Sequence, residues 1–144
     1  MRVVISTLLI SITVAAPTLI MAQDSLIVPP VWQRADRVME TLCPSAAKHR
    51  KNMDVFGVEG NVGRNEAIAT ANTAKRCGDS AHGLDRARLY AEAVAAYHTI
   101  HSVDSDMMKS IHAKEVALIH QALPLAKPDK ELVETLHSFE DQMP

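Results

Sequence analysis

Residues 85–101 read DRARLYAEAVAAYHTIH, and this stretch decides the fold class. Its apolar side chains recur every three or four residues, which is the period of an α-helix. Two apolar stripes run along it together, one through Leu89, Ala93, Ala96 and Ile100, the other through Tyr90, Val94, Tyr97 and His101. A helix that is apolar on two sides is typical of a protein interior. We therefore expect a central helix that begins near Asp85 and is covered by other helices.

Before this stretch the sequence predicts two or three helices. The first begins after Pro29 and keeps helical apolar spacing up to Leu42. Pro44 either kinks this helix or opens a second one, because proline disfavours helical geometry in the preceding residue and suits a first helical turn. The helix after that is expected to start at Asn65, with an acidic residue in its first turn. The main loop is predicted around three glycines, Gly57, Gly60 and Gly63.

After the central helix two more helices are expected. Residues 102–106 interrupt the pattern and offer several capping side chains, and Pro124 ends or bends the helix that follows. Pro128 starts the last helix. Alternating apolar and polar residues of the kind that indicates a β-strand are missing from the chain after its amino-terminal segment. The predicted fold is all-α, a compact bundle of four to six short helices.

The amino-terminal segment has the layout of a secretory signal. Arg2 is followed by a run of apolar and hydroxyl residues, and the small residue Ala22 stands just before charge resumes. We expect cleavage after Ala22, giving a signal peptide at 1–22, a linker at 23–30 and a single helical domain at 31–144. The alternative is an uncleaved membrane anchor, since the run approaches the roughly 20 residues that span a bilayer. Either way the rest of the chain is expected to be periplasmic or secreted.

Cys43 and Cys77 are the only cysteines in the sequence. In an oxidising compartment two isolated thiols are expected to pair, and closing the loop between them would stabilise the fold by about 3–4 kcal/mol. A redox or metal-binding thiol is disfavoured, because neither cysteine belongs to a Cys-x-x-Cys motif. The sequence therefore predicts a bundle that is stapled by one disulfide.

Seven histidines are the main candidates for chemistry. A His/Met cluster is conceivable where the central helix turns into the next one, formed by His98, His101, Met108 and His112. Imidazole with a soft sulfur suits copper, and imidazole with Glu115 suits zinc. The competing interpretation is that these are half-exposed histidines and core methionines on ordinary helices. We expect no cofactor.

Other patterns fall short of a catalytic set. Glu134-x-x-His137 is a single forward copy of an element that di-iron bundles use twice. Ser80 and His82 lie in one short turn, which does not orient a catalytic triad by itself. The net charge of −2 is too mild to indicate a nucleic-acid partner. The sequence therefore does not predict an enzyme, and a membrane contact is expected only through the signal segment.

A small exported helical domain of this kind is typical of a binding module that acts on a protein partner, as an inhibitor, immunity protein or envelope accessory. In architecture alone it is similar to periplasmic immunity proteins of secreted bacterial toxins, which also combine an export signal, helices and a disulfide. Small insect odorant carriers share the size and helicity but usually have more cysteines. The alternatives are a periplasmic metal-binding or metal-sensing protein and, third, an enzyme of unknown type.

We expect the partner to contact the main loop and the acidic surface of the last two helices, on the general ground that loops carry function. The candidate residues are Gly57, Gly60, Asn61, Gly63, Arg64, Glu131, Glu134, Glu140 and Asp141.

Overall fold

The protein is an all-α bundle, as predicted. In this computed structural model, residues 28–102 and 104–143 are described, and they form six helices and no β-strand. The helices are α2 (Pro30–Leu42), α3 (Pro44–Phe56), α4 (Asn61–Ser80), α5 (Gly83–His98), α6 (Ser105–Ala126) and α7 (Lys130–Asp141). The predicted signal peptide lies outside the described residues. None of the helices within them is long and apolar enough to cross a membrane.

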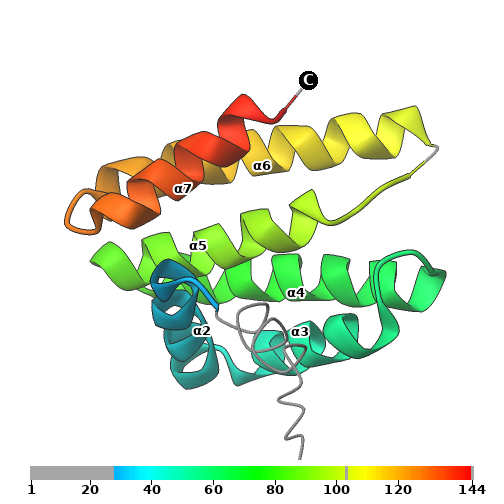
Figure 1. The fold of residues 1–144 in the computed structure, drawn as a ribbon, viewed down its shortest axis with the longest axis horizontal. Coiled ribbons are helices and arrows are strands. Elements are labelled where there is room, and N and C mark those ends of the chain that lie inside the picture. The colour runs from blue at the N-terminus through cyan, green and yellow to red at the C-terminus, as the bar shows by residue number, and fades with distance from the viewer. Residues whose placement is uncertain (1–27, 103, 144) are drawn as a thin grey trace, which may run out of the picture.

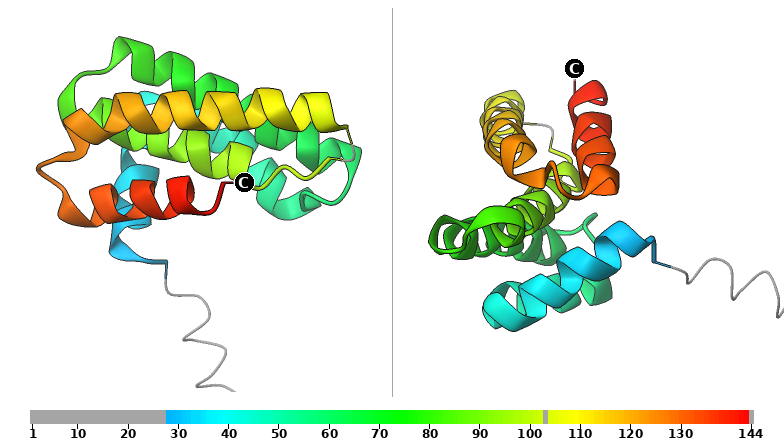
Figure 2. Two further views of the ribbon diagram at one scale, coloured as in Figure 1. Left: turned by 90° about the horizontal axis from the view of Figure 1, so that it is seen from above. Right: turned by 90° about the vertical axis from the view of Figure 1, so that its left-hand side faces the viewer.

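The helices are stacked in three layers. In Figure 1 and Figure 2, α2 and α3 form one outer layer, α4 and α5 the middle, and α6 and α7 the other outer layer. α5 lies in the middle layer and contacts helices of all three layers, namely α2, α4, α6 and α7. It is therefore the central helix that its two apolar stripes predict. Both stripes are buried, except at His101, which lies beyond the end of α5 and is exposed.

Small side chains set the spacing of the middle layer. Gly78 of α4 packs against Tyr90 of α5 so closely that a Cβ on Gly78 would lie 2.6 Å from the tyrosine ring. The alanines of α5 are likewise buried, with Ala87, Ala91 and Ala93 fully covered. The interior between α4 and α5 is therefore filled largely by small side chains that let the helices pack closely.

Pro44 opens a new helix and does not kink the first one. Cys43 separates α2 from α3 with a non-helical backbone, at φ −143° and ψ 59°. Pro44 occupies the first position of α3, where the hydrogen bond that a proline cannot donate is not needed. The Cys43 N–H still donates to the Met39 carbonyl at 2.8 Å and closes α2.

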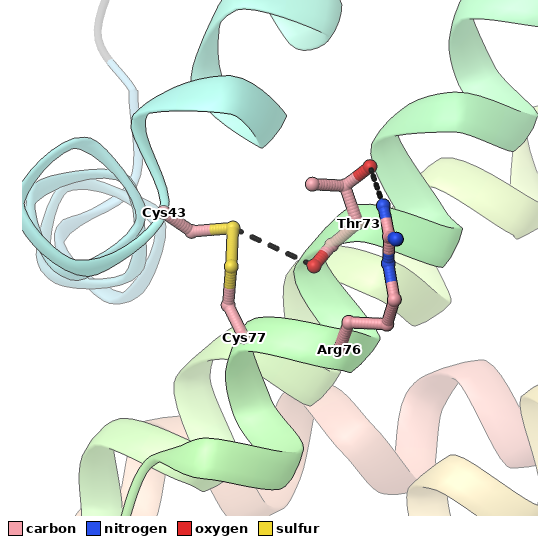
Figure 3. Close-up of a disulfide and its surroundings, with 4 residues drawn as sticks. All are labelled: Cys43, Thr73, Arg76 and Cys77. Atoms are coloured by element: carbon pink, nitrogen blue, oxygen red, sulfur yellow. Dashed lines mark hydrogen bonds between the residues drawn. A yellow bond between two sulfur atoms is a disulfide. The ribbon is translucent and has the colours of Figure 1, made fainter.

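The predicted disulfide joins this junction to α4. Cys43 and Cys77 are bonded, with their Cα atoms 5.8 Å apart. Figure 3 shows Cys43 between its two helices and Cys77 on α4, with Cys43 Sγ 3.5 Å from the Thr73 carbonyl oxygen. Cys43 is only 1% exposed. The bridge ties an outer layer of the bundle to its middle.

One helix start differs from the sequence prediction, and the structure excludes one of the two roles predicted for Pro124. α4 begins at Asn61 and not at Asn65, because Gly63 allows the first turn of the helix to pack directly on the Gly57 carbonyl. α6 continues through Pro124 to Ala126, so Pro124 does not end the helix. Proline removes the one hydrogen bond that its missing N–H would donate, and here that loss falls in the last turn of α6.

Asp129 anchors the last helix to two other helices. Its Oδ1 accepts a hydrogen bond from the Leu132 N–H at 3.3 Å and caps α7. The same carboxylate accepts hydrogen bonds from Arg34 of α2 at 3.0 and 3.1 Å and from Arg88 of α5 at 3.2 Å. Burial opposes the ionisation of Asp129, but the hydrogen bonds from Arg34, the Leu132 N–H and Arg88 outweigh it and hold its pKa below the ordinary value.

Replacing Asp129 with alanine is expected to lower the free energy of unfolding by about 2–3 kcal/mol. The variant loses the cap and leaves two partly buried arginines without this partner. Asp129→Asn keeps a capping side chain and is expected to lose less. Urea unfolding at pH 7 measures the change. The control is Asp141→Ala on the exposed end of the same helix, for which we expect a change within about 0.5 kcal/mol. Equal losses at both positions would contradict the anchoring role.

Candidate functional site

The most exposed large apolar side chains of the described residues gather where α3 turns into α4. Val55 is 79% exposed, Phe56 60% and Val62 56%. We call these three side chains, together with the connecting residues 57–60, the α3–α4 corner. It lies at the right-hand end of α3 and α4 in Figure 1. Removing apolar side chains from water is favourable, so a group of three that stays exposed indicates an interaction surface.

Two glycines fix the backbone of this corner. Gly57 ends α3 at φ +68°, a left-handed conformation that favours glycine, and its N–H donates to the Met53 carbonyl at 2.9 Å. At Gly63 an added Cβ would lie 1.4 Å from the Gly57 carbonyl oxygen, so no side chain fits there. The corner is therefore a tight turn between two helices, shorter than the main loop that was predicted around the three glycines.

The predicted loop residues lie in the corner or directly after it. Gly57, Gly60 and Asn61 are exposed, Arg64 is half-buried and Gly63 is buried. Sequence reasoning did not single out these three apolar side chains as a surface. Val55 and Phe56 are the last two residues of α3. The face that α3 buries is formed by other residues, Ala46, Ala47 and Met53.

The predicted acidic surface is partly neutralised by internal contacts. Glu131 Oε2 lies 2.8 Å from Arg34 Nη2, and Glu134 Oε1 lies 3.8 Å from Lys130 Nζ. Glu140 contacts two imidazoles, His120 at 2.9 Å and His137 at 3.4 Å, and these hydrogen bonds lower its pKa. Asp141 is exposed. Three of the four predicted carboxylates are therefore engaged within the bundle.

A buried carboxylate gathers two of the four predicted metal ligands. Glu115 is fully buried, and its two oxygens lie 3.1 Å from His98 Nδ1 and 3.0 Å from His112 Nδ1. His98 also packs edge-on against Phe139, with the ring centroids 5.0 Å apart. The cluster therefore links α5, α6 and α7.

The other two predicted ligands lie outside this cluster's hydrogen bonds. His101 is exposed, and Met108 is half-buried one helical turn before His112. Among the residues that the structure describes, no three His, Cys, Asp or Glu side chains are arranged to hold a metal ion. The geometry shows Glu115 orienting two imidazoles through their Nδ1 atoms.

A second buried carboxylate lies on the other side of α5. Glu92 is fully buried, and its Oε2 accepts a hydrogen bond from Arg50 of α3 at 2.7 Å. Its Oε1 has no hydrogen-bond partner among the described residues. Burial raises the pKa of Glu92 to about 7; Arg50 opposes this shift, and the neighbouring Asp36 of α2 reinforces it. This carboxyl therefore titrates near neutral pH.

The short Ser80–His82 turn shows no catalytic arrangement. His82 is exposed at the amino-terminal end of α5. The neighbouring Asp79 carboxylate accepts hydrogen bonds from Tyr90 and Lys75, both at 2.7 Å. Those bonds lower the pKa of Asp79, and the acid acts as a link between α4 and α5.

Comparison with protein-family models, with curated protein sequences and with solved structures finds no match to this chain. The function is therefore inferred from the sequence and the geometry of the chain itself.

Proposed function

We propose that this protein is an exported binding module that docks on a protein partner through the α3–α4 corner. The observation that carries the proposal is the exposure of Phe56 between Val55 and Val62 on a tight turn. Fully burying such side chains contributes about 1.5–3 kcal/mol each. A few apolar anchors of this kind carry most of the binding free energy at protein interfaces.

The surroundings of the corner match the usual anatomy of an interface. Exposed polar residues flank the apolar group, including Asp54 on α3, Glu59 in the turn and Asn61 at the start of α4. Protein interfaces commonly have such an apolar centre with a polar rim. The fixed backbone at Gly57 and Gly63 reduces the conformational entropy that the corner loses on binding.

Export is part of the proposal. The amino-terminal sequence has the layout of a signal, and the Cys43–Cys77 disulfide fits an oxidising compartment. The partner is then a protein of the periplasm or the cell exterior, such as an exported enzyme, a toxin or an envelope complex. An inhibitor, an immunity protein and an envelope accessory all act by covering a partner's surface in this way.

Photo-cross-linking in the producing cells tests the corner. A photoreactive phenylalanine analogue at position 56 is expected to give discrete adducts larger than the protein itself. The same analogue at Lys130, whose side chain is 91% exposed on α7, is the control and is expected to give none. Val62→Glu should abolish the Phe56 adducts, because it places a charge in the apolar centre. Val62 is exposed, so this variant is expected to fold.

Two results would contradict the proposal. One is the same adduct pattern from positions 56 and 130, which would indicate random collision. The other is an adduct from position 56 that Val62→Glu leaves unchanged. Once the partner is identified from the adduct, Val55→Glu is expected to weaken its binding by about 10- to 100-fold.

A further inference from the structure

A cavity of about 170 Å³ lies where α4, α5 and α6 meet, and it shares no residue with the α3–α4 corner. Its apolar part is formed by Ala117 and Leu118 of α6 and by Tyr97 of α5. Its polar part includes Asn72 and Lys75 of α4 and Lys114 of α6. An apolar cavity with a few converging polar groups is the usual form of a small-molecule site.

The polar groups of this cavity offer hydrogen-bond donors. The Tyr97 hydroxyl donates to Asn72 Oδ1 at 2.5 Å, which occupies the amide oxygen and leaves the Asn72 Nδ2 protons as donors. Burial raises the pKa of Tyr97, so the hydroxyl keeps its proton at neutral pH.

Lys114 adds positive charge beside these donors, with its Nζ 5.8 Å from the centre of the Tyr97 ring. Lys75 Nζ is paired with the Asp79 carboxylate at 2.7 Å, which offsets its charge and leaves two of its three protons as further donors. Donors and positive charge together favour an anionic acceptor such as a carboxylate.

The volume limits the size of the ligand. A space of about 170 Å³ corresponds to about six water molecules in the liquid. It holds one ring or a short chain with a single acidic group, and it is smaller than the cavities that bind drug-sized molecules.

We propose that this cavity binds a small monocarboxylate with an apolar body. The carboxylate lies beside Lys114 and Asn72, and the apolar body lies against Leu118 and the Tyr97 ring. This inference is independent of the proposed protein partner, since the two sites have no residue in common.

An NMR titration of the purified protein with benzoate tests the proposal. We expect saturable binding, with a Kd on the order of 0.1–1 mM for so small a ligand, and the largest shifts at Leu118 and Tyr97. Benzyl alcohol and benzylamine have the same ring without the negative charge, and we expect them to bind at least about tenfold more weakly. Hexanoate serves as the aliphatic counterpart, and its affinity relative to benzoate shows whether the natural ligand is a ring or a chain.

Three variants separate charge from shape. Lys114→Gln should weaken benzoate binding about tenfold and leave benzyl alcohol unchanged. Lys109→Gln is the matched control, because it removes the same charge from an 80% exposed side chain of the same helix. Ala117→Leu fills the cavity without changing the charge and should abolish binding. Lys114 and Ala117 are both exposed, so these variants are expected to fold.

The proposal is overturned if benzoate does not saturate, or if its shifts lie away from Leu118 and Tyr97. It is also overturned if benzyl alcohol or benzylamine binds as tightly as benzoate, or if Lys109→Gln weakens binding as much as Lys114→Gln. None of these results bears on the cross-linking at Phe56.

Discussion

The Glu92→Gln variant is expected to be more stable than the wild-type protein at pH 8, by about 2–3 kcal/mol, and to differ little from it at pH 4.5. Glu92 is fully buried, with Arg50 on one carboxyl oxygen and no hydrogen-bond partner for the other among the described residues. A proton on Glu92 Oε1 would bond the neighbouring Asp36. Glutamine has the same shape and offers an amide N–H in place of that proton at every pH.

The raised pKa of Glu92 determines whether the free energy of unfolding rises or falls with pH. Burial raises the pKa of Glu92 from 4.5 to about 7 in the folded protein. Between these values the folded state binds more protons than the unfolded state, so the free energy of unfolding falls as the pH rises. The contribution of the protonated carboxyl is complete below pH 4.5 and is lost as the pH rises through about 7. Above pH 7, Glu92 and Asp36 are two neighbouring negative charges. Arg50, which donates to Glu92, also lies 3.7 Å from Asp54.

Urea unfolding of both proteins at several pH values between about 4.5 and 8.5 measures this difference. Other carboxylates with lowered pKa values, including Asp79 and Asp129, contribute equally to both proteins and cancel in the difference. Glu134→Gln is the control, since its side chain is 66% exposed and its removal should leave the wild-type pH dependence intact. Parallel curves for Glu92→Gln and the wild type would show that Glu92 ionises in the folded protein as it does in water.

The periodicity of apolar residues predicted the all-α fold and the position of its central helix. The double stripe of residues 85–101 predicts a central helix, and α5 occupies that place. The predicted pairing of Cys43 with Cys77 is also confirmed, and it rests on a different reason, because two cysteines have only one way to pair within a chain. The sequence left the role of Pro44 open, since a kink and a new helix begin with the same residue. The non-helical backbone at Cys43 decides for a new helix.

The apolar periodicity of the sequence did not predict which charged side chains are buried. Glu92 and Glu115 look like solvent-facing residues of ordinary helices, because burial of a carboxylate depends on partners from other helices. For Glu92 the partner is Arg50 of α3, and for Glu115 it is His98 of α5 as well as His112 three residues earlier. The buried face of α6 therefore includes Glu115 together with Leu118, and the apolar Val116 and Leu123 are only half-buried.

The glycines show a related limit. Gly57 and Gly63 were both interpreted as flexible loop residues, and only Gly57 has the positive φ that suits that role. Gly63 is helical and is required because it packs against the Gly57 carbonyl. A sequence shows that a side chain is missing but not what occupies the space. For this reason the tight turn is seen only in the structure, as is the exposure of Phe56.

Removing the disulfide by replacing Cys43 and Cys77 with alanine is expected to lower the free energy of unfolding by about 3–4 kcal/mol. The bond closes a loop with a sequence separation of 34 residues, and the loss follows from the larger conformational entropy of the unfolded chain without it. Small domains of this kind are stable by about 5–15 kcal/mol, so the variant keeps its fold with a much smaller margin. Alanine is chosen because Cys43 is buried, and a serine hydroxyl there would need a partner.

Urea unfolding at pH 7 of the wild type and the double variant, each with and without a phosphine reductant, separates loop closure from packing. The reductant should lower the transition midpoint of the wild type towards that of the variant and leave the variant unchanged, because the variant has no bond to break. Any difference that persists between the reduced wild type and the variant measures the packing of the two sulfurs, of which Cys43 contacts the Thr73 carbonyl. If the variant loses less than about 1 kcal/mol, the packing of α2 and α3 on the middle layer holds the bundle without the bridge. The disulfide would then not be the staple that its position between the layers implies.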